Sequence, residues 1–299
     1  MRDLERLEDL ISQYNYFLLD AYGVFWASAK HGLISGTKEA MKHLVSCQKT
    51  VGILSNSTQL ASRAKEKYAK HGLYEGVHYH FLLTSGEVTH EILSSKNLPF
   101  PTPQKKYYLF GTDHPRFTSP AILFQKTEYS RTDSIHEADF IYIAIPHIDG
   151  EDQEASSAFL KSVQVAAKMG LPVLCANPDR YAHEGSPPRL VVRQGTIAQL
   201  FQEEGSAVFF IGKPYIPIFE RALEFFPDHV LPREILMVGD TPETDVRGAR
   251  QMKIASALVT QTGVMKELIG NEKLSFTLNQ LPETDRPDHL IPSLNLHEL

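Results

Sequence analysis

Residues 16–26, YFLLDAYGVFW, show the clearest structural signal in the chain. The apolar run from Tyr16 to Leu19 is too short for a helix and ends at a carboxylate, Asp20, with Gly23 three residues later. This pattern predicts a buried strand that runs into a sharp turn. Asp20 is then expected at the carboxyl end of a strand, where open α/β sheets place their reactive groups.

Three later segments have the same form, an apolar run that ends at polar residues. Helical patterns separate these runs, which favours parallel strands in a doubly wound α/β sheet. As neighbours in one sheet, the four strands would bring an Asp, a Ser, a Lys and two further Asp residues to one crevice. The runs are Val51–Leu54 before Ser55, Ala207–Ile211 before Lys213, and Ile235–Val238 before Asp240 and Asp245.

The order of these motifs resembles that of the haloacid dehalogenase (HAD) superfamily of hydrolases. The chain has Asp-X-X-Gly-Val after one strand, Ser after a second, Gly-Lys-Pro after a third and Gly-Asp-X-X-X-Thr-Asp after a fourth. More narrowly, LLDAYGVFW, GILSNST, CANPDR, FIGKPYIPIFERAL and MVGDTPETDVRGA resemble segments of the class IIA phosphatases, the relatives of nitrophenyl, nucleotide and pyridoxal phosphate phosphatases. The resemblance covers residues 17–263. It implies a Rossmann-like core with a large inserted α/β cap domain.

The spacing of the motifs agrees with an inserted domain. Ser55 and Lys213 are 158 residues apart, whereas Asp20 and Ser55 are only 35 apart. The longer interval is too large for a loop and must hold a domain of its own. We therefore expect the first part of the core at 1–83, the cap at 84–205 and the second part of the core at 206–299.

Composition favours a protein that acts on small molecules. The 299 residues are 42% hydrophobic and 22% charged, which is typical of globular domains. A formal charge of −6, with Lys and Arg spread along the chain, argues against nucleic acid as a partner. No run reaches the ~18 apolar residues of a membrane span. The N-terminal residues form an amphipathic pattern and not a signal peptide.

Cellular setting and assembly follow from weaker signals. Cys47 and Cys175 each lie among apolar neighbours, which favours buried thiols in a reducing compartment, although a disulfide between them stays open at this level. We expect a cytoplasmic enzyme whose partner is a small phosphorylated metabolite. Analogy with the family suggests a homodimer through the cap.

The family resemblance implies that Asp20 is a nucleophile that accepts the phosphoryl group. A carboxylate is already ionised at neutral pH and needs no base to activate it. An Asp after a strand more often just opens a turn. The three companion motifs favour the catalytic role.

The resemblance also implies a Mg²⁺ site. Asp20, the backbone carbonyl of Tyr22 and Asp240 would bind the ion, and Asp245 would support it directly or through water. Oxygen ligands of this kind suit Mg²⁺. The structural alternatives are a turn residue for Asp240 and an acid at a helix N-terminus for Asp245.

Phosphoryl binding is assigned by the same resemblance. Lys213 would balance the negative charge, and Ser55, with the backbone amides of Asn56 and Ser57, would hold the phosphoryl group at a helix start. The alternatives are a solvated lysine and a plain helix cap.

Two groups of polar residues in the predicted cap are ambiguous. Asn177, Asp179 and Arg180 follow a strand and match a class IIA motif, so they could face the substrate, but a Pro-containing turn with an Asx hydrogen bond explains them equally well. A second cluster has no fixed ligand spacing and is expected to be a solvated loop: His147, Asp149, Glu151 and Asp152.

Tyr22 departs from the phosphatase pattern, which has Asp two residues after the nucleophile. A phenol with a pKa of about 10 can donate a proton weakly but cannot act as a base at pH 7. We therefore expect a slow Mg²⁺-dependent phosphatase. The alternatives are a protein that binds phosphorylated metabolites with little or no turnover and a haloacid dehalogenase-like enzyme, because Asp-Ala-Tyr-Gly also resembles the first motif of those dehalogenases.

Overall fold

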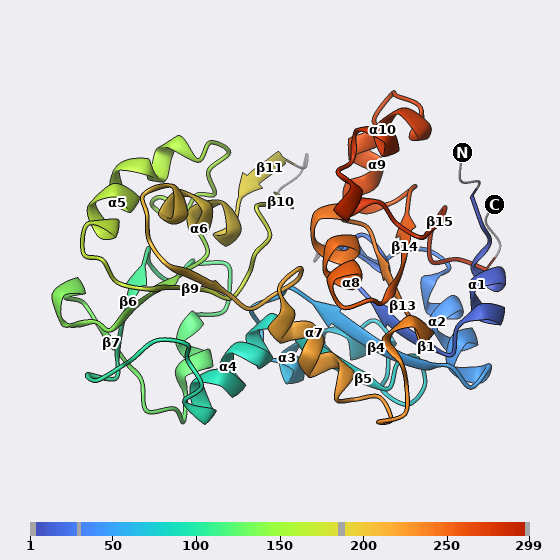
Figure 1. Cartoon of the computed structure of the whole chain (residues 1–299), viewed down its shortest axis with the longest axis horizontal. Helices are drawn as coiled ribbons and strands as arrows, with labels where there is room; N and C mark the ends of the chain where they lie inside the picture. The colour runs from blue at the N-terminus through green and yellow to red at the C-terminus, as the bar shows by residue number, and fades with distance from the viewer. Residues whose placement is uncertain (1–3, 29–30, 185–188, 297–299) are drawn as a thin grey trace. The chain divides into compact units, whose positions relative to one another are not determined.

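The computed structural model describes residues 4–28, 31–184 and 189–296. They fold into two compact units, and Figure 1 shows their elements coloured along the chain. We call these the core unit, within residues 1–55, 61–83 and 213–299, and the cap unit, within residues 56–60 and 84–212. The core unit is thus assembled from three separate segments of the chain.

A six-stranded sheet forms the centre of the core unit, in the order β15-β14-β13-β1-β4-β5. β1 pairs in parallel with β13 and β4, so that Leu19 lies opposite Val238 on one side and Ile53 on the other. This register brings the carboxyl ends of the three strands to one edge of the sheet. The strands are Tyr16–Leu19 (β1), Thr50–Ser55 (β4), Phe81–Thr84 (β5), Ile235–Gly239 (β13), Ala255–Val259 (β14) and His289–Ile291 (β15).

Helices cover both faces of the core sheet. Ala257 and Val259 of β14 belong to the hydrophobic cluster that contains the buried residues of the first three helices, whereas Leu258 packs with Val246 and Met265 in another cluster. Successive side chains of a strand point to opposite faces, so these clusters lie on the two faces of the sheet. The predicted doubly wound parallel sheet is confirmed. The helices are α1 (Leu7–Gln13), α2 (Thr37–Ser46), α3 (Ala61–Ala69), α7 (Ile216–Leu223), α8 (Arg247–Gln251), α9 (Gly263–Ile269) and α10 (Leu274–Gln280).

Shorter elements complete the core unit. Strands β2 (Trp26–Ser28) and β3 (Gly32–Leu33) form an antiparallel hairpin after the Asp20 turn. A π-helical turn, η4 (Pro242–Val246), follows β13 and leads into α8. Two 3-10 turns are η3 (Pro232–Glu234) and η5 (Glu283–Asp285).

A second, five-stranded parallel sheet forms the centre of the cap unit, in the order β12-β9-β8-β6-β7. Helices α5 and α6 pack on one face through Phe159, Val163 and Phe201, and on the other face Tyr107 stacks on Phe124 at 3.7 Å between ring centroids. The strands are Lys106–Phe110 (β6), Ser130–Thr132 (β7), Phe140–Ile143 (β8), Val173–Cys175 (β9) and Val208–Phe210 (β12), with a hairpin of Tyr181–Glu184 (β10) and Arg189–Val192 (β11). The helices are α4 (Ser85–Ser95), α5 (Ser157–Ala167), α6 (Gln194–Glu203), η1 (Pro120–Phe124) and η2 (Ile135–Glu137).

One strand that we predicted for the core sheet belongs to the other sheet. β12 pairs with β9 in the cap unit, with Val208 opposite Val173. The expectation that all four motif strands are neighbours in one sheet is therefore wrong for this strand. A short apolar run suits either parallel sheet, because its pattern does not specify its neighbour. Lys213, three residues beyond β12, nevertheless belongs to the core unit.

Two further sequence expectations need correction. Cys175 is buried as expected, but Cys47, just after α2, is exposed, and both cysteines are free thiols. The sequence patterns also gave no sign of β5 or α4. After α3, the chain passes from the core unit into the cap unit at the end of β5, and α4 follows in the cap unit. In the part of the chain that the structure describes, none of the helices combines the length and the apolar character needed to cross a bilayer.

Candidate active site

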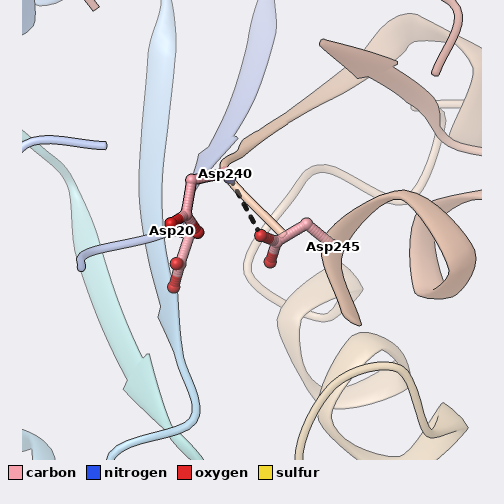
Figure 2. A group of neighbouring side chains, drawn as sticks. All are labelled: Asp20, Asp240 and Asp245. Carbon is pink, nitrogen blue, oxygen red and sulfur yellow. Dashed lines mark hydrogen bonds between the residues drawn. The ribbon is translucent and has the colours of Figure 1, made fainter. Parts of the chain in front are cut away.

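Three carboxylates meet at the carboxyl edge of the core sheet. Asp20 follows β1 directly, and its N–H donates to the carbonyl of Val238 in the neighbouring strand at 2.9 Å. Asp240 follows β13, and Asp245 lies in the η4 turn. Each of the three carboxylates offers an oxygen within 4.8 Å of the others. Figure 2 shows the three side chains as neighbours. The strand tips that bear Asp20 and Asp240 therefore meet as predicted.

Lys213 supplies positive charge inside this group. Its Nζ donates to Asp20 Oδ1 at 2.6 Å and to Asp245 Oδ1 at 2.7 Å. The residue is only 1% exposed, so water does not screen these ion pairs. The alternative of a solvated surface lysine is excluded by this burial.

Asp245 orders the turn around it. Its Oδ2 accepts the backbone N–H groups of Asp240 and Thr241, each at 3.1 Å, while Oδ1 accepts Lys213. Gly239 has no room for a side chain, because a Cβ there would lie 2.2 Å from the Asp245 Cβ. Asp245 thus holds both Lys213 and the start of the Asp240 loop.

Asp240 is fixed by the loops that surround it. The Thr241 hydroxyl donates to Oδ1 at 3.0 Å, and the Val264 N–H donates to Oδ2 at 2.7 Å. Gly23 and Gly263 both lie against this carboxylate, where a Cβ would approach Asp240 Oδ2 to 2.1 Å and 2.0 Å. The Gly23 required by the first motif therefore gives Asp240 its space.

Burial and mutual repulsion change the acidity of the site. Burial raises the pKa of Asp20; Lys213 lowers it and Asp245 raises it further, and the net result is a pKa of about 7. Burial, followed by the charges of Asp20 and Asp245, raises the pKa of Asp240 well above its ordinary value. Burial would lower the pKa of Lys213, but Asp20 and Asp245 outweigh it and raise that pKa. One lysine therefore does not fully neutralise the three acids.

The donor chemistry fits a hard divalent cation. All the close ligand atoms are carboxylate oxygens, which Mg²⁺ and Ca²⁺ prefer, and the carboxylates have more negative charge than Lys213 can balance. Asp245 already accepts three hydrogen bonds, so it suits a supporting position better than direct binding. Asp20 and Asp240 are the better candidates for direct ligands.

Ser55 and Tyr22 each lie near the end of a core-sheet strand: Ser55 ends β4, and Tyr22 lies two residues after Asp20. Ser55 is buried; it lies two positions beyond Ile53, which pairs with Leu19. Tyr22 is 45% exposed, and its Oη accepts a hydrogen bond from Lys67 Nζ at 3.3 Å. Burial lowers the pKa of Lys67 to about 8, so this amine is still mainly protonated at pH 7.

Two contributors were not found from the sequence. Lys67, on α3, contacts Tyr22, and the Thr262 hydroxyl donates to the Gly23 carbonyl at 2.6 Å. Lys67 lies among several basic residues of an amphipathic helix, and Thr262 lies in a loop without a motif. No local signal in the sequence distinguishes either residue from a surface residue.

The remaining predicted binding residues lie in the cap unit. Asn56 Nδ2 donates to Asp179 Oδ1 at 2.7 Å, and the Asp179 N–H donates to Asn177 Oδ1 at 2.9 Å. The second contact is the Asx hydrogen bond of the structural alternative. The Cζ atom of Arg180 lies 5.8 Å from the ring centroid of Tyr181. The Ser57 hydroxyl accepts a hydrogen bond from the Gln59 N–H. A role of these five residues toward substrate stays a prediction.

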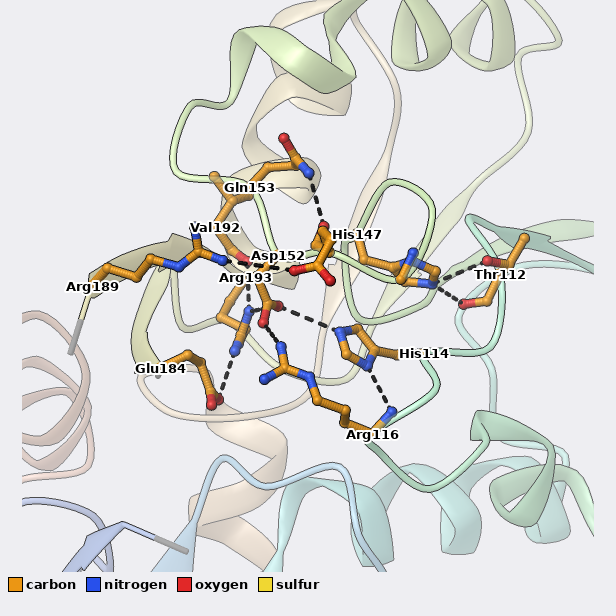
Figure 3. A network of polar contacts seen from close by, with 12 residues as sticks. Thr112, His114, Arg116, His147, Asp152, Gln153, Glu184, Arg189, Val192 and Arg193 are labelled. Atoms are coloured by element: carbon orange, nitrogen blue, oxygen red, sulfur yellow. Dashed lines mark hydrogen bonds and ion pairs between the residues drawn. The ribbon is translucent and has the colours of Figure 1, made fainter. Parts of the chain in front are cut away.

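The acidic loop of the cap unit is not a simple solvated loop. Asp152 is buried and pairs with Arg193 at 2.9 Å, with Arg116 and, at 3.5 Å, with His114 (Figure 3). Arg193 also pairs with Glu184 at 2.7 Å. The solvated-loop interpretation is therefore wrong for Asp152, because the arginines that bury it are distant in sequence.

Family models match both segments that contain the core motifs. Residues 17–119 match a model described as haloacid dehalogenase-like hydrolase, and residues 210–296 match one described as HAD-hydrolase-like. The chain is a haloacid dehalogenase-like hydrolase. The residues of this HAD hydrolase between the two matches, 120–209, belong to the cap unit. The predictions of the superfamily and of a hydrolytic enzyme are confirmed.

Solved structures share the fold of this HAD hydrolase over nearly its whole length. A haloacid dehalogenase-like hydrolase from Brucella suis has a TM-score of 0.76 at 21% identity, with 97% of this chain and 98% of that chain covered. A possible sugar phosphatase of the HAD superfamily from Cytophaga hutchinsonii has a TM-score of 0.74 at 22% identity, with 100% of both chains covered. Glycerol phosphate phosphatase from Mycobacterium tuberculosis, in complex with magnesium, has a TM-score of 0.67 at 15% identity, with 98% and 78% covered. A search of curated protein sequences found no match.

Proposed function

We propose that this HAD hydrolase cleaves small phosphate monoesters through an aspartyl phosphate on Asp20. The observation that carries the proposal is the buried group at the sheet edge, in which Lys213 bonds Asp20 at 2.6 Å and Asp240 and Asp245 lie within 4.8 Å. A nucleophilic carboxylate, a neutralising lysine and two further acids are the parts that phosphoryl transfer to Asp requires. The phosphatases among the structural relatives support the same class of reaction.

The reaction would proceed in two displacements. A carboxylate oxygen of Asp20 attacks phosphorus, the bond from phosphorus to the leaving oxygen breaks, and the leaving oxygen keeps the electron pair and takes up a proton from Tyr22 or solvent. Water then attacks phosphorus and releases its proton to solvent, while the bond from phosphorus to Asp20 breaks and returns the electron pair to the carboxylate. The products are an alcohol and inorganic phosphate; Asp20 is regenerated, and where Tyr22 has supplied the proton, solvent protonates it again.

The other residues of the site have distinct proposed roles. Lys213 would hold Asp20 in position and balance the charge of the phosphoryl oxygens. Ser55, with Asn56 and Ser57, would bind those oxygens through hydrogen bonds, and Asn177, Asp179 and Arg180 would contact the rest of the substrate. Burial would favour these charge interactions, because Coulomb energies rise as the local dielectric falls.

Magnesium is the proposed cofactor. Asp20, Asp240 and the Tyr22 backbone carbonyl would bind it, with Asp245 in support. When bound, the ion would supply positive charge that lowers the repulsion between the carboxylates and the phosphoryl oxygens. The magnesium complex of the Mycobacterium tuberculosis relative supports this choice.

Turnover is proposed to be slow because of Tyr22. The phenol would protonate a leaving oxygen poorly and could not accept a proton from water at pH 7. Loss of one general acid or base lowers rates by about 10²- to 10⁴-fold. The same residue favours the second candidate, a protein that binds phosphorylated metabolites without useful turnover.

Hydrolysis of 4-nitrophenyl phosphate with and without Mg²⁺ tests the proposal. Wild-type turnover that requires Mg²⁺ and is abolished by Asp20→Asn supports it, with the exposed Asp228→Asn as matched control. An inert wild type that gains activity through Tyr22→Asp would instead favour the binding protein. Halide release from a 2-haloacid without metal would identify a dehalogenase. The cytoplasmic location and the homodimer predicted from the sequence stay predictions.

A further inference from the structure

The ammonium group of Lys67 is surrounded by three aromatic rings of the core unit. Its Nζ lies 5.0 Å from the ring centroid of Tyr22, 4.8 Å from that of Trp26 and 4.6 Å from that of Tyr68. Each distance is within the ~6 Å range of a cation–π interaction. An amine with three such neighbours is held far more firmly than an ordinary surface lysine.

Two of the three rings form a rigid base. Trp26 is 1% exposed and Tyr68 is 2% exposed, and their ring centroids are 5.2 Å apart. His71 packs edge-on against Trp26 at 4.7 Å, and Phe25 packs against Tyr68 at 5.3 Å. Close packing of this kind leaves these rings little freedom. The position of the Lys67 ammonium is thereby set by the buried interior of the core unit.

The third ring is different, because Tyr22 is 45% exposed. Lys67 Nζ donates to its Oη at 3.3 Å and also faces its ring. An ammonium group has donors only, so the Tyr22 oxygen must be the acceptor in this contact. The Tyr22 O–H proton is then directed to another partner. A cation beside the oxygen also makes the O–H a stronger hydrogen-bond donor.

The contact between Lys67 and Tyr22 matters because of the position of Tyr22 in the chain. It lies two residues after Asp20, on the turn that leaves the nucleophile strand. We propose that Lys67 is a positioning residue that anchors Tyr22 and orients its hydroxyl as a hydrogen-bond donor to the leaving oxygen of the substrate. The inference rests on the proposed phosphatase function. In this inference, Tyr22 and Lys67 together partly replace the Asp that the phosphatase motif has in the place of Tyr22. Only Tyr22 lies in a motif.

Leaving groups of different quality test this role. A 4-nitrophenolate needs little help to depart, whereas an alkoxide such as that of glycerol phosphate needs a hydrogen-bond donor. We expect Lys67→Met to lower kcat/KM for glycerol phosphate at least ten-fold more than for 4-nitrophenyl phosphate. Tyr22→Phe should give the same selective loss, the double variant should be no worse than Tyr22→Phe, and Lys67→Arg should recover part of the loss.

The matched control is Lys65→Met. Lys65 lies on the same helix but forms an exposed ion pair with Glu75, so its removal should affect both substrates equally and little. Equal losses on the two substrates in Lys67→Met would mean a merely structural role and would overturn the inference.

A measurement without substrate checks the contact itself. In urea unfolding, the midpoint shifts of Lys67→Met and Tyr22→Phe should be non-additive in the double variant, because both remove the same interaction. Additive shifts overturn the inference and leave the proposed function intact. A wild type inert on both phosphate monoesters overturns the proposed function and the positioning role together.

Discussion

Asp240 is packed so closely that two neighbouring residues must be glycine. Gly23 and Gly263 have φ angles of +80° and +61°, a region that side chains adopt only with strain, and a Cβ at either position would collide with the Asp240 carboxylate. The lack of space and the positive φ angle therefore both require glycine, at each of the two positions. The geometry of the acidic group depends on these glycines as much as on the acids.

Gly263→Ala should therefore be destabilised beyond the strain of its φ angle. We expect a loss of about 2–4 kcal/mol in the free energy of unfolding, from left-handed strain plus displacement of Asp240. Gly76→Ala is the matched control, because Gly76 has φ +79° and no atom within 4 Å of a Cβ, so only the strain of about 1–2 kcal/mol applies. Urea unfolding of both variants measures the difference. Equal losses would show that Asp240 moves aside freely.

At the scale of elements, buried carboxylates connect segments that are distant in sequence. Asp285 of η5 accepts Arg247 of α8 through two bonds, at 2.7 Å and 2.6 Å. Asp152 connects the loop after β8 with Arg193 at the start of α6 (Figure 3). Such ion pairs fix the relative position of the two segments that they join, because the donor and acceptor geometry must match.

Asp285→Ala should lower the free energy of unfolding by about 2–3 kcal/mol, because it removes a bidentate pair and leaves Arg247 without its buried partner. Glu283→Ala is the matched control two residues away. Its pair with Arg250 is longer, at 3.5 Å, and exposed, so we expect a change below about 0.5 kcal/mol. Thermal or urea unfolding measures both, and similar losses would contradict the importance of the Arg247 pair.

The Asp152 network should make stability depend on pH. Burial lowers the pKa of His114 below its ordinary value of 6.5, although Asp152 opposes the shift. The unfolded chain therefore binds the proton first as the pH falls below 6.5, and the folded state loses stability between that pH and the folded-state pKa.

His114→Gln should remove part of this acid sensitivity. We expect the change in the urea midpoint from pH 7 to pH 5 to be less destabilising, or more stabilising, in the variant than in wild type, whatever the absolute stability of the variant. Other groups also contribute to the slope: burial lowers the pKa of His78, which acts in the same direction as His114, whereas the raised pKa values of Asp20 and Asp240 act in the opposite direction. The exposed His136→Gln is the control and should keep the wild-type slope. An unchanged slope in His114→Gln would place the acid sensitivity elsewhere.

At the scale of the whole molecule, the core unit is assembled from three segments of the chain, and the acidic group joins the first to the last. Asp20 comes from the first segment, and Lys213, Asp240 and Asp245 come from the last. A ligand that binds this group should therefore stabilise the folded core unit as one body. That the two compact units also fold as separate domains stays a prediction.

Addition of Mg²⁺ should accordingly raise the melting temperature. At a free concentration 100 times the Kd, binding to the folded state alone adds about 2.7 kcal/mol of stability. Asp240→Asn should abolish the shift, whereas NaCl of equal ionic strength should not produce it. Calorimetry or thermal scanning measures the effect. A shift that survives in Asp240→Asn would place the cation outside the acidic group.

The strands and their polar ends were predictable because their signals are local. A run such as Phe17–Leu19 is apolar over a few residues and stops at Asp20, and the same holds before Ser55 and Asp240. Parallel strands bring such ends to one edge wherever they are neighbours in one sheet, as β1, β4 and β13 are. For this reason β1, β4 and β13 and the meeting of Asp20 with Asp240 were predicted correctly, whereas β5 was missed and β12 was assigned to the wrong sheet.

The sequence by itself determined the doubly wound fold, the superfamily and the acidic residues of the candidate site. Each of these has a signal within a few consecutive residues of the chain. Only the tertiary structure decided that β12 lies in the cap sheet, that Asp152 is buried by arginines, and that Lys67 is enclosed by Tyr22, Trp26 and Tyr68. The physical reason is the same in all three cases. Strand pairing, ion pairing and ring packing join residues far apart in the chain, and their free energy depends on partners that no local pattern names.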